Sequence, residues 1–154
     1  MISPVSILCL ISLLVAAPQA PVVQNASPAT FVGTWVGVQV WTGENVSLSA
    51  KTPQQVTLTI DMVDGKLSGA MPFFGGTDMA TFVDSKVVGE MLEASAIIKK
   101  PDAAAQRKAW TDDVKVNFHL KADKVNMTGT ADVFLGDVKW ITFKYDLGKK
   151  RALY

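Results

Sequence analysis

Residues 55–73 carry the pattern that most limits how this chain can fold. In the first half of the segment apolar and polar residues alternate, as in a β-strand that is buried on one face. Asp64-Gly65 follows, and this dipeptide favours the type I′ turn of a two-residue hairpin. Folding there pairs Met62 with Leu67, Ile60 with Gly69, Leu58 with Met71 and Val56 with Phe73. Because a slip of one residue would break all of these pairs, the sequence predicts an antiparallel hairpin.

The same alternation returns along the rest of the chain. A second hairpin is predicted from residues 114–120 and 125–133, joined at 121–124. Further strands are expected at 31–42, 79–87, 91–99 and 138–147. Within the central pair, a turn at 88–90 gives one apolar face made of Leu92, Ala94, Ala96 and Ile98. A slip or a bulge would instead turn Glu93 inward, and both registers stay open at this point.

About eight strands joined in chain order predict an all-β fold, an antiparallel up-and-down barrel, because closure removes the exposed edges of the sheet. The connections fall into two sets. The turns at one end are tight, and the links at the other end, where functional residues usually lie, are longer: 43–54, 74–78, 100–113 and 135–137. Residues 101–110 combine an early proline with an alanine run, so they predict one short helix in a long loop.

The first predicted strand contains Gly33-Thr34-Trp35, a Gly-x-Trp motif with an eight-strand meander behind it. This arrangement resembles the calycins, the group of barrels that includes the lipocalins and avidins. In lipocalins the tryptophan plugs the closed end of the barrel and a basic residue after the last strand covers it. The resemblance implies that Trp35 plugs the tight-turn end and that Arg151 covers it by a cation–π contact, with Lys149 and Lys150 as substitutes.

The resemblance does not extend to every calycin motif. The second lipocalin motif is missing near residues 121–124, where only Asp123 stands. Avidins place an asparagine for biotin soon after the tryptophan, whereas this chain has Val36 and Gly37, so biotin binding is not expected. Most of the chain is also similar to small secreted bacterial proteins of unassigned function, which share the Gly-Thr-Trp strand and imply no activity.

The N-terminus has the features of an export signal. Residues 7–15 form an apolar run too short to span a bilayer, and small residues and prolines follow at 16–21. We therefore expect a signal peptide at 1–20, a flexible segment at 21–30, one barrel domain at 31–154, and a secreted or periplasmic location. The exact cleavage point stays open. Cys9, the one cysteine, falls within the signal, so disulfides and thiolate chemistry are excluded from the mature chain.

The charges and the titratable residues exclude several classes of function. With 15 Lys and Arg against 14 Asp and Glu, the chain has no basic excess for nucleic acid. The single histidine, His119, alternates with an apolar face and should point to solvent, so triad catalysis and His-rich metal sites lack their parts. Asp102 and Asp112-Asp113 read as caps and turns. No catalytic residue, metal or cofactor is assigned.

The inward faces of the predicted strands define the expected site. The interior would be lined by Leu58, Ile60, Met71, Phe73, Phe118, Met127, Phe143 and Tyr145. The mouth would carry Trp41, Phe74, Lys100, Arg107 and Trp110, and the closed end Gly33, Trp35 and Arg151. An eight-stranded barrel is just wide enough to be filled by side chains or to hold one small ligand. Inward glycines and alanines favour a cavity, although Gly69 and Gly129 also suit sharply coiled strands.

The expected function is the non-catalytic binding of a small apolar or amphiphilic ligand inside the barrel. Three alternatives remain. A filled barrel could be an interaction module that uses the outer stripe of Val36, Val38 and Val40. An isomerase or cyclase could use Tyr145, Asp146 or Glu93. An outer-membrane barrel would need aromatic girdles, which the strands lack, so no membrane insertion of the mature chain is expected. Ligand identity and oligomeric state stay open.

Overall fold

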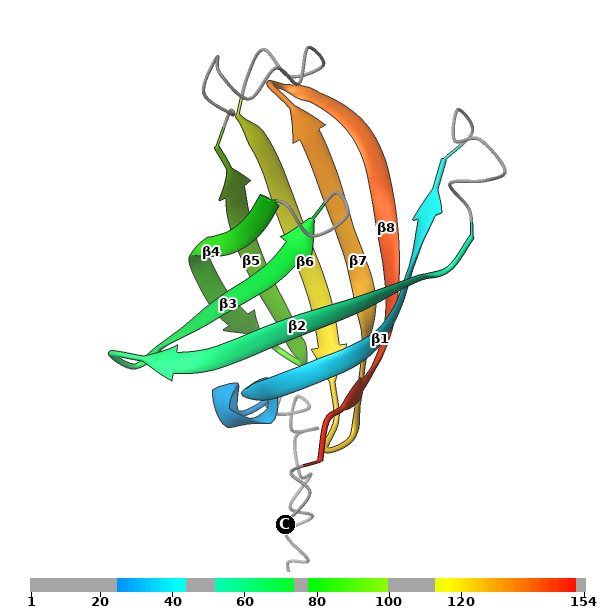
Figure 1. Ribbon diagram of the computed structural model, residues 1–154. Coiled ribbons are helices and arrows are strands. Elements are labelled where there is room, and N and C mark those ends of the chain that lie inside the picture. The colour runs from blue at the N-terminus through cyan, green and yellow to red at the C-terminus, as the bar shows by residue number, and fades with distance from the viewer. Residues whose placement is uncertain (1–24, 44–51, 74–77, 100–112, 152–154) are drawn as a thin grey trace, which may run out of the picture.

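The computed structural model describes residues 25–43, 52–73, 78–99 and 113–151, and these form eight strands (Figure 1). The strands are β1 (Gly33–Thr42), β2 (Gln54–Val63), β3 (Lys66–Phe73), β4 (Asp78–Val88), β5 (Met91–Ile98), β6 (Val114–Ala122), β7 (Asn126–Leu135) and β8 (Val138–Lys149). One turn of 3-10 helix, η1 (Pro28–Thr30), precedes β1. None of the helical structure in the described residues is long and apolar enough to cross a membrane.

The eight strands follow one another around a closed antiparallel barrel, which confirms the predicted fold class. The closing ladder joins β1 to β8, from the pair Trp35 and Lys149 to the pair Thr42 and Thr142. This architecture is compatible with a calycin-like fold. Residues 101–110, where a helix was predicted, lie outside the described residues, and so does the expected signal peptide at 1–20.

Both predicted hairpins are present. In the first, Met62 pairs with Leu67 and Ile60 with Gly69, but the ladder ends at Thr59 and Ala70 and does not reach the other two predicted pairs, Leu58 with Met71 and Val56 with Phe73. The turn between the strands has positive φ angles at Asp64 (50°) and Gly65 (76°), as the type I′ conformation requires. In the second hairpin the chain turns at 123–125 rather than at the predicted 121–124, and the pairs are Leu120 with Gly129, Phe118 with Ala131, and Val116 with Val133. Apolar residues therefore meet on the inner face of both hairpins.

The central pair takes the first of its two predicted registers. The chain turns at Gly89-Glu90, and the alternate residues of β5 from Leu92 to Ile98 are buried. Glu93 lies on the outer face, where its Oε2 is 3.0 Å from Nζ of Lys86. A bulge is present, but it falls in β4, between Phe82 and Asp84. Because the extra residue, Val83, belongs to β4, the alternation of β5 is undisturbed and Glu93 stays outside.

The chain before β1 is attached to the tight-turn end of the barrel. The backbone N–H of Ala26 donates to the carbonyl of Gly89 at 2.6 Å, and the N–H of Gly89 donates to Oδ1 of Asn25 at 3.0 Å. Residues 25–30, the described part of the segment expected to be flexible, therefore lie against the β4–β5 turn, and η1 leads directly into Phe31.

The inward glycines serve close packing. A Cβ atom on Gly69 would lie 2.4 Å from the ring of Phe82, so that ring occupies the space that the glycine leaves. A Cβ atom on Gly37 would lie 2.1 Å from the carbonyl oxygen of Asp146 in the neighbouring strand. Gly37 therefore lets the backbones of β1 and β8 coil tightly around each other. At Gly69 the prediction of a cavity from small residues is not supported.

We predict that Gly37→Ala lowers the free energy of unfolding by about 1–3 kcal/mol, because the new methyl group overlaps the β8 backbone. Gly148→Ala is the matched control, since its Cβ would have no neighbour closer than 3.9 Å. Urea unfolding of both variants and the native chain measures the difference. Equal stability of the two variants would contradict the close approach of β1 and β8.

Candidate functional site in the barrel lumen

One end of the lumen is filled by Trp35 and Phe31, which are both fully buried. Nε1 of Trp35 donates a hydrogen bond to the carbonyl oxygen of Phe31 at 2.8 Å. Since Phe31 directly follows η1, this bond joins the N-terminal segment to the first strand of the barrel. The predicted closed-end residues Gly33 and Trp35 thus lie where the tight turns meet, and the end is sealed by packing.

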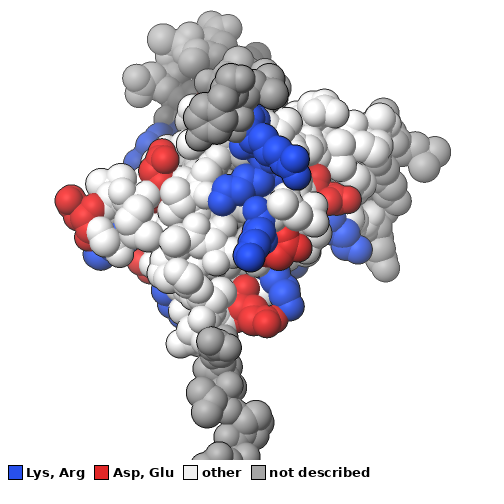
Figure 2. Space-filling model, turned by 90° about the horizontal axis from the view of Figure 1, so that it is seen from below, with Lys and Arg blue, Asp and Glu red and all other residues white. Residues whose placement is uncertain are grey.

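The cation over Trp35 is Lys149, whose Nζ is 5.0 Å from the ring centroid. Arg151 was expected to make this contact, with Lys149 and Lys150 as substitutes. The structure corrects this expectation, because Lys149 lies over the ring. The register gives the reason: Lys149 is the β8 residue paired directly with Trp35, whereas Arg151 lies beyond the end of β8 and is exposed. Figure 2, a view of the molecule from below, shows Lys and Arg side chains near the centre of this face.

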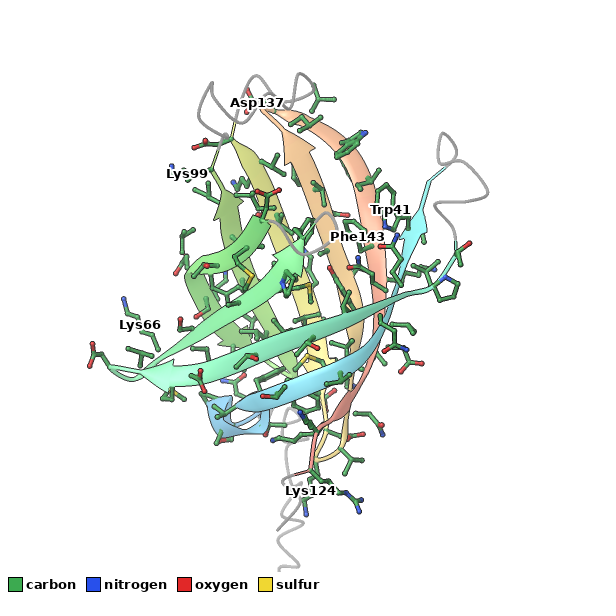
Figure 3. All side chains as sticks on the ribbon, viewed as in Figure 1. Trp41, Lys66, Lys99, Lys124, Asp137 and Phe143 are labelled. Atoms are coloured by element: carbon green, nitrogen blue, oxygen red, sulfur yellow. The ribbon has the colours of Figure 1, made fainter. Side chains whose placement is uncertain are left out.

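The other half of the lumen is lined by aromatic rings. The rings of Trp41 and Phe143 pack edge to face, with centroids 5.3 Å apart (Figure 3). Phe73 of β3 meets Phe143 of β8 at the same distance of 5.3 Å. Tyr145 extends the group, 6.3 Å from Phe143 and 6.1 Å from Phe118. Because β3 and β8 are not neighbouring strands, the contact between Phe73 and Phe143 spans the lumen.

All eight predicted interior residues are buried, with at most 4% of any side chain exposed. They do not all lie in the same part of the lumen. Leu58 pairs with Trp35 and Ile60 with Gly33, so these two lie beside the plug. Phe73, Phe143 and Tyr145 belong to the aromatic group away from Trp35. The sequence thus predicted the shared interior but did not separate the part beside Trp35 from the aromatic part.

Of the five predicted mouth residues, the structure describes Trp41, and its ring turns inward to Phe143. The other four lie outside the described residues: Phe74, Lys100, Arg107 and Trp110.

Among the described residues, three buried polar atoms have no hydrogen-bond partner: Oε1 of Gln39, Nε1 of Trp41 and the hydroxyl of Tyr145. Gln39 is 7% exposed and Tyr145 is 4% exposed. Nε2 of Gln39 donates to Oε1 of Gln54 at 3.2 Å, which leaves the Gln39 oxygen free. Burial raises the pKa of the Tyr145 phenol far above its ordinary range, so the hydroxyl keeps its proton. Buried polar groups without partners are rare in folded proteins and call for a water or a ligand.

Sequence reasoning did not identify Gln39. The available signal was the alternation in β1, where Trp35, Gly37, Gln39 and Trp41 share the face opposite the Val36, Val38 and Val40 stripe. A glutamine on that face would have indicated a polar position inside an otherwise apolar barrel.

The outer face of β4, β5 and β6 has a groove of about 270 Å³ that collects charged and polar side chains. Its lining includes Asp84, Lys86, Glu93, Ser95, Lys115, Asn117 and His119. Two contacts tie these groups to each other: Glu93 with Lys86 at 3.0 Å, and the Ser95 hydroxyl with Oδ1 of Asn117 at 3.1 Å. His119 is exposed, as predicted. The groove is shallow polar surface and offers no desolvated acid or base.

The lumen itself offers little acid–base chemistry. Of the acid–base candidates, Glu93 and Asp146 face outward and Tyr145 faces inward. Among the described residues, Gln39 is the one buried side chain of the polar or charged class. Across the described ranges, no group of three or more His, Cys, Asp or Glu side chains could hold a metal ion. The arrangement favours binding by burial and a few hydrogen bonds.

The chain matches no protein-family model, and comparisons with curated proteins and with solved structures give no match. The argument for function therefore depends on the geometry of the lumen.

We predict that Lys149→Met lowers the free energy of unfolding by about 0.5–1 kcal/mol, because it removes the cation over Trp35 and keeps an apolar stem of similar length. Arg151→Met is the control and should change stability by less than about 0.5 kcal/mol, as exposed substitutions usually do. Urea unfolding of both variants measures the effects. A larger loss for Arg151→Met than for Lys149→Met would contradict the contact.

Proposed function

We propose that this protein is a secreted, non-catalytic binding protein that holds a small apolar or amphiphilic ligand in the half of its barrel away from Trp35. The observation that carries the proposal is the contrast between the two ends of the lumen. At one end, Trp35 is fully buried, bonded to Phe31 and covered by Lys149. Toward the other end, Trp41, Phe73 and Phe143 pack edge to face beside polar atoms that lack partners.

The aromatic side chains in this half of the barrel suit a ligand that is bound mainly by burial of apolar surface. Aromatic rings supply large apolar surfaces, and each ring that packs on a ligand removes that surface from water. Trp41 is only partly buried, so part of this residue stays in contact with solvent. Among the buried described residues no side chain is ionisable at neutral pH, so a charged group on the ligand would have to stay at the rim.

The proposed relationship is to the calycins, and within them to the lipocalins. It is supported by the closed eight-stranded barrel, by Gly33-Thr34-Trp35 at the start of β1, and by the lysine over that tryptophan. We also propose export of the chain, with removal of residues 1–20 and a secreted or periplasmic location. The apolar run at 7–15 and the small residues after it support this.

A second candidate function is protein interaction, and one region of the barrel favours it. The ladder between β3 and β4 extends from Ala70–Thr81 to Phe73–Asp78 and does not include the first residues of β3. The Ser85 hydroxyl spans this opening to the carbonyl of Leu67 at 2.6 Å. Val63 and Val83 border it and are 53% and 61% exposed. A partly unpaired strand with apolar neighbours is a surface on which a second copy could pair.

We predict that the native protein binds the neutral fluorescent probe N-phenyl-1-naphthylamine and that Trp41→Ala weakens this binding about tenfold or more, as expected when a central aromatic contact is removed. Trp140→Ala is the matched control, because Trp140 lies on the outside of β8 and is 43% exposed. Fluorescence titration gives both affinities.

Equal affinity of the two tryptophan variants would contradict binding in the lumen. A lack of probe binding, together with self-association that Val83→Lys abolishes in light-scattering measurements, would favour the interaction function instead.

A further inference from the structure

Among the described residues, the three buried polar atoms without partners belong to side chains of two neighbouring strands, β1 and β8. Gln39 and Tyr145 are direct cross-strand partners between β1 and β8, and Trp41 is paired with Phe143 one step nearer the end of β1. Opposite residues in an antiparallel ladder have Cα atoms about 4.5–5.5 Å apart, and residues two apart along a strand are about 7 Å apart. The Cα atoms of the three residues therefore lie within one small region of the inner wall, and we name these residues the polar patch: Gln39, Trp41 and Tyr145.

The polar patch has a definite hydrogen-bonding character. Nε1 of Trp41 can only donate, the free Oε1 of Gln39 can only accept, and the hydroxyl of Tyr145 can do either. A ligand group that satisfies the patch must therefore donate one hydrogen bond and accept at least one.

None of the three side chains of the polar patch is charged at neutral pH. Its phenol stays protonated because burial disfavours the ionised form. Lys149, a cation at the sealed end, is already placed over Trp35. An anionic group brought to the patch would lose its hydration without gaining a counter-ion among the buried described residues.

We propose that the polar patch selects a ligand with an uncharged head group that both donates and accepts hydrogen bonds, such as an alcohol or a primary amide, attached to an apolar body. The head group binds Oε1 of Gln39 as donor and Nε1 of Trp41 as acceptor, and the Tyr145 hydroxyl completes the set. The apolar body packs on Phe73 and Phe143. This inference rests on the proposed function and names the ligand class for the same lumen.

The test compares three probes that share a ten-carbon chain: 1-decanol, methyl decanoate and decanoate. Titration calorimetry at pH 7, where decanoate is ionised, gives the three affinities. We expect 1-decanol to bind about fivefold more tightly than methyl decanoate, because the ester cannot donate to Gln39. Decanoate should bind about tenfold or more weakly than 1-decanol, since its charge is desolvated without a partner.

Two variants assign the selectivity to the patch. In Gln39→Leu and in Tyr145→Phe the preference for 1-decanol over methyl decanoate should fall to within about twofold, while N-phenyl-1-naphthylamine still binds. Thr57→Val, on the exposed face of β2, is the matched control and should keep the full preference. Tyr145→Phe should not lower the free energy of unfolding of the ligand-free protein, because the hydroxyl has no partner to lose.

The outcomes separate this inference from the proposed function. Equal affinities for the three probes, or tightest binding of decanoate, would overturn the uncharged head group while N-phenyl-1-naphthylamine binding still supports a lumen site. A marked loss of stability in ligand-free Tyr145→Phe would also overturn it, since the hydroxyl would then be partnered. Absence of binding by every probe would overturn both.

Discussion

The pairing of β1 with β8 is the constraint on which the rest of this structure depends. It joins the two ends of the strand series and turns a meander into a closed wall. The same ladder supports both halves of the lumen. At the sealed end it sets Lys149 opposite Trp35, and farther along the barrel it sets Tyr145 opposite Gln39 and Phe143 opposite Trp41. Gly37 allows this ladder to coil tightly, because any side chain there would overlap the β8 backbone.

This single wall gives the lumen two different chemical environments. Trp35 fills one end and satisfies its only polar atom internally, through the carbonyl of Phe31. Trp41, six residues later on the same face, is partly exposed, and its Nε1 has no hydrogen-bond partner among the described residues. A buried indole N–H usually finds an acceptor within the protein. The contrast between the two tryptophans is the physical basis for assigning structure to one end and binding to the other.

The strands were predictable because local signals agreed with each other. Asp64-Gly65 fixed a turn, and the alternation on both sides then fixed the register of the hairpin. The partner of Trp35 was not predictable to the residue, because it depends on the register between β1 and β8, which are far apart in the sequence. The role of Gly69 was missed for a similar reason: an open position and a position filled by Phe82 look alike in sequence. The inward position of Gln39 could have been predicted from the alternation in β1. That its Oε1 has no hydrogen-bond partner among the described residues could be seen only from the atomic positions.

Closure itself can be tested with a single cross-link. Val38 and Asp146 are direct partners in the β1–β8 ladder and both lie on its outer face. With Cys9 replaced by serine, Val38→Cys/Asp146→Cys should form an intramolecular disulfide under mild oxidation, because such pairs lie within disulfide reach. Val38→Cys/Lys115→Cys, which joins β1 to β6, should not. A closed barrel predicts the bond in the first variant alone; no intramolecular bond there, or equal bonding in both, would contradict the closure of the wall.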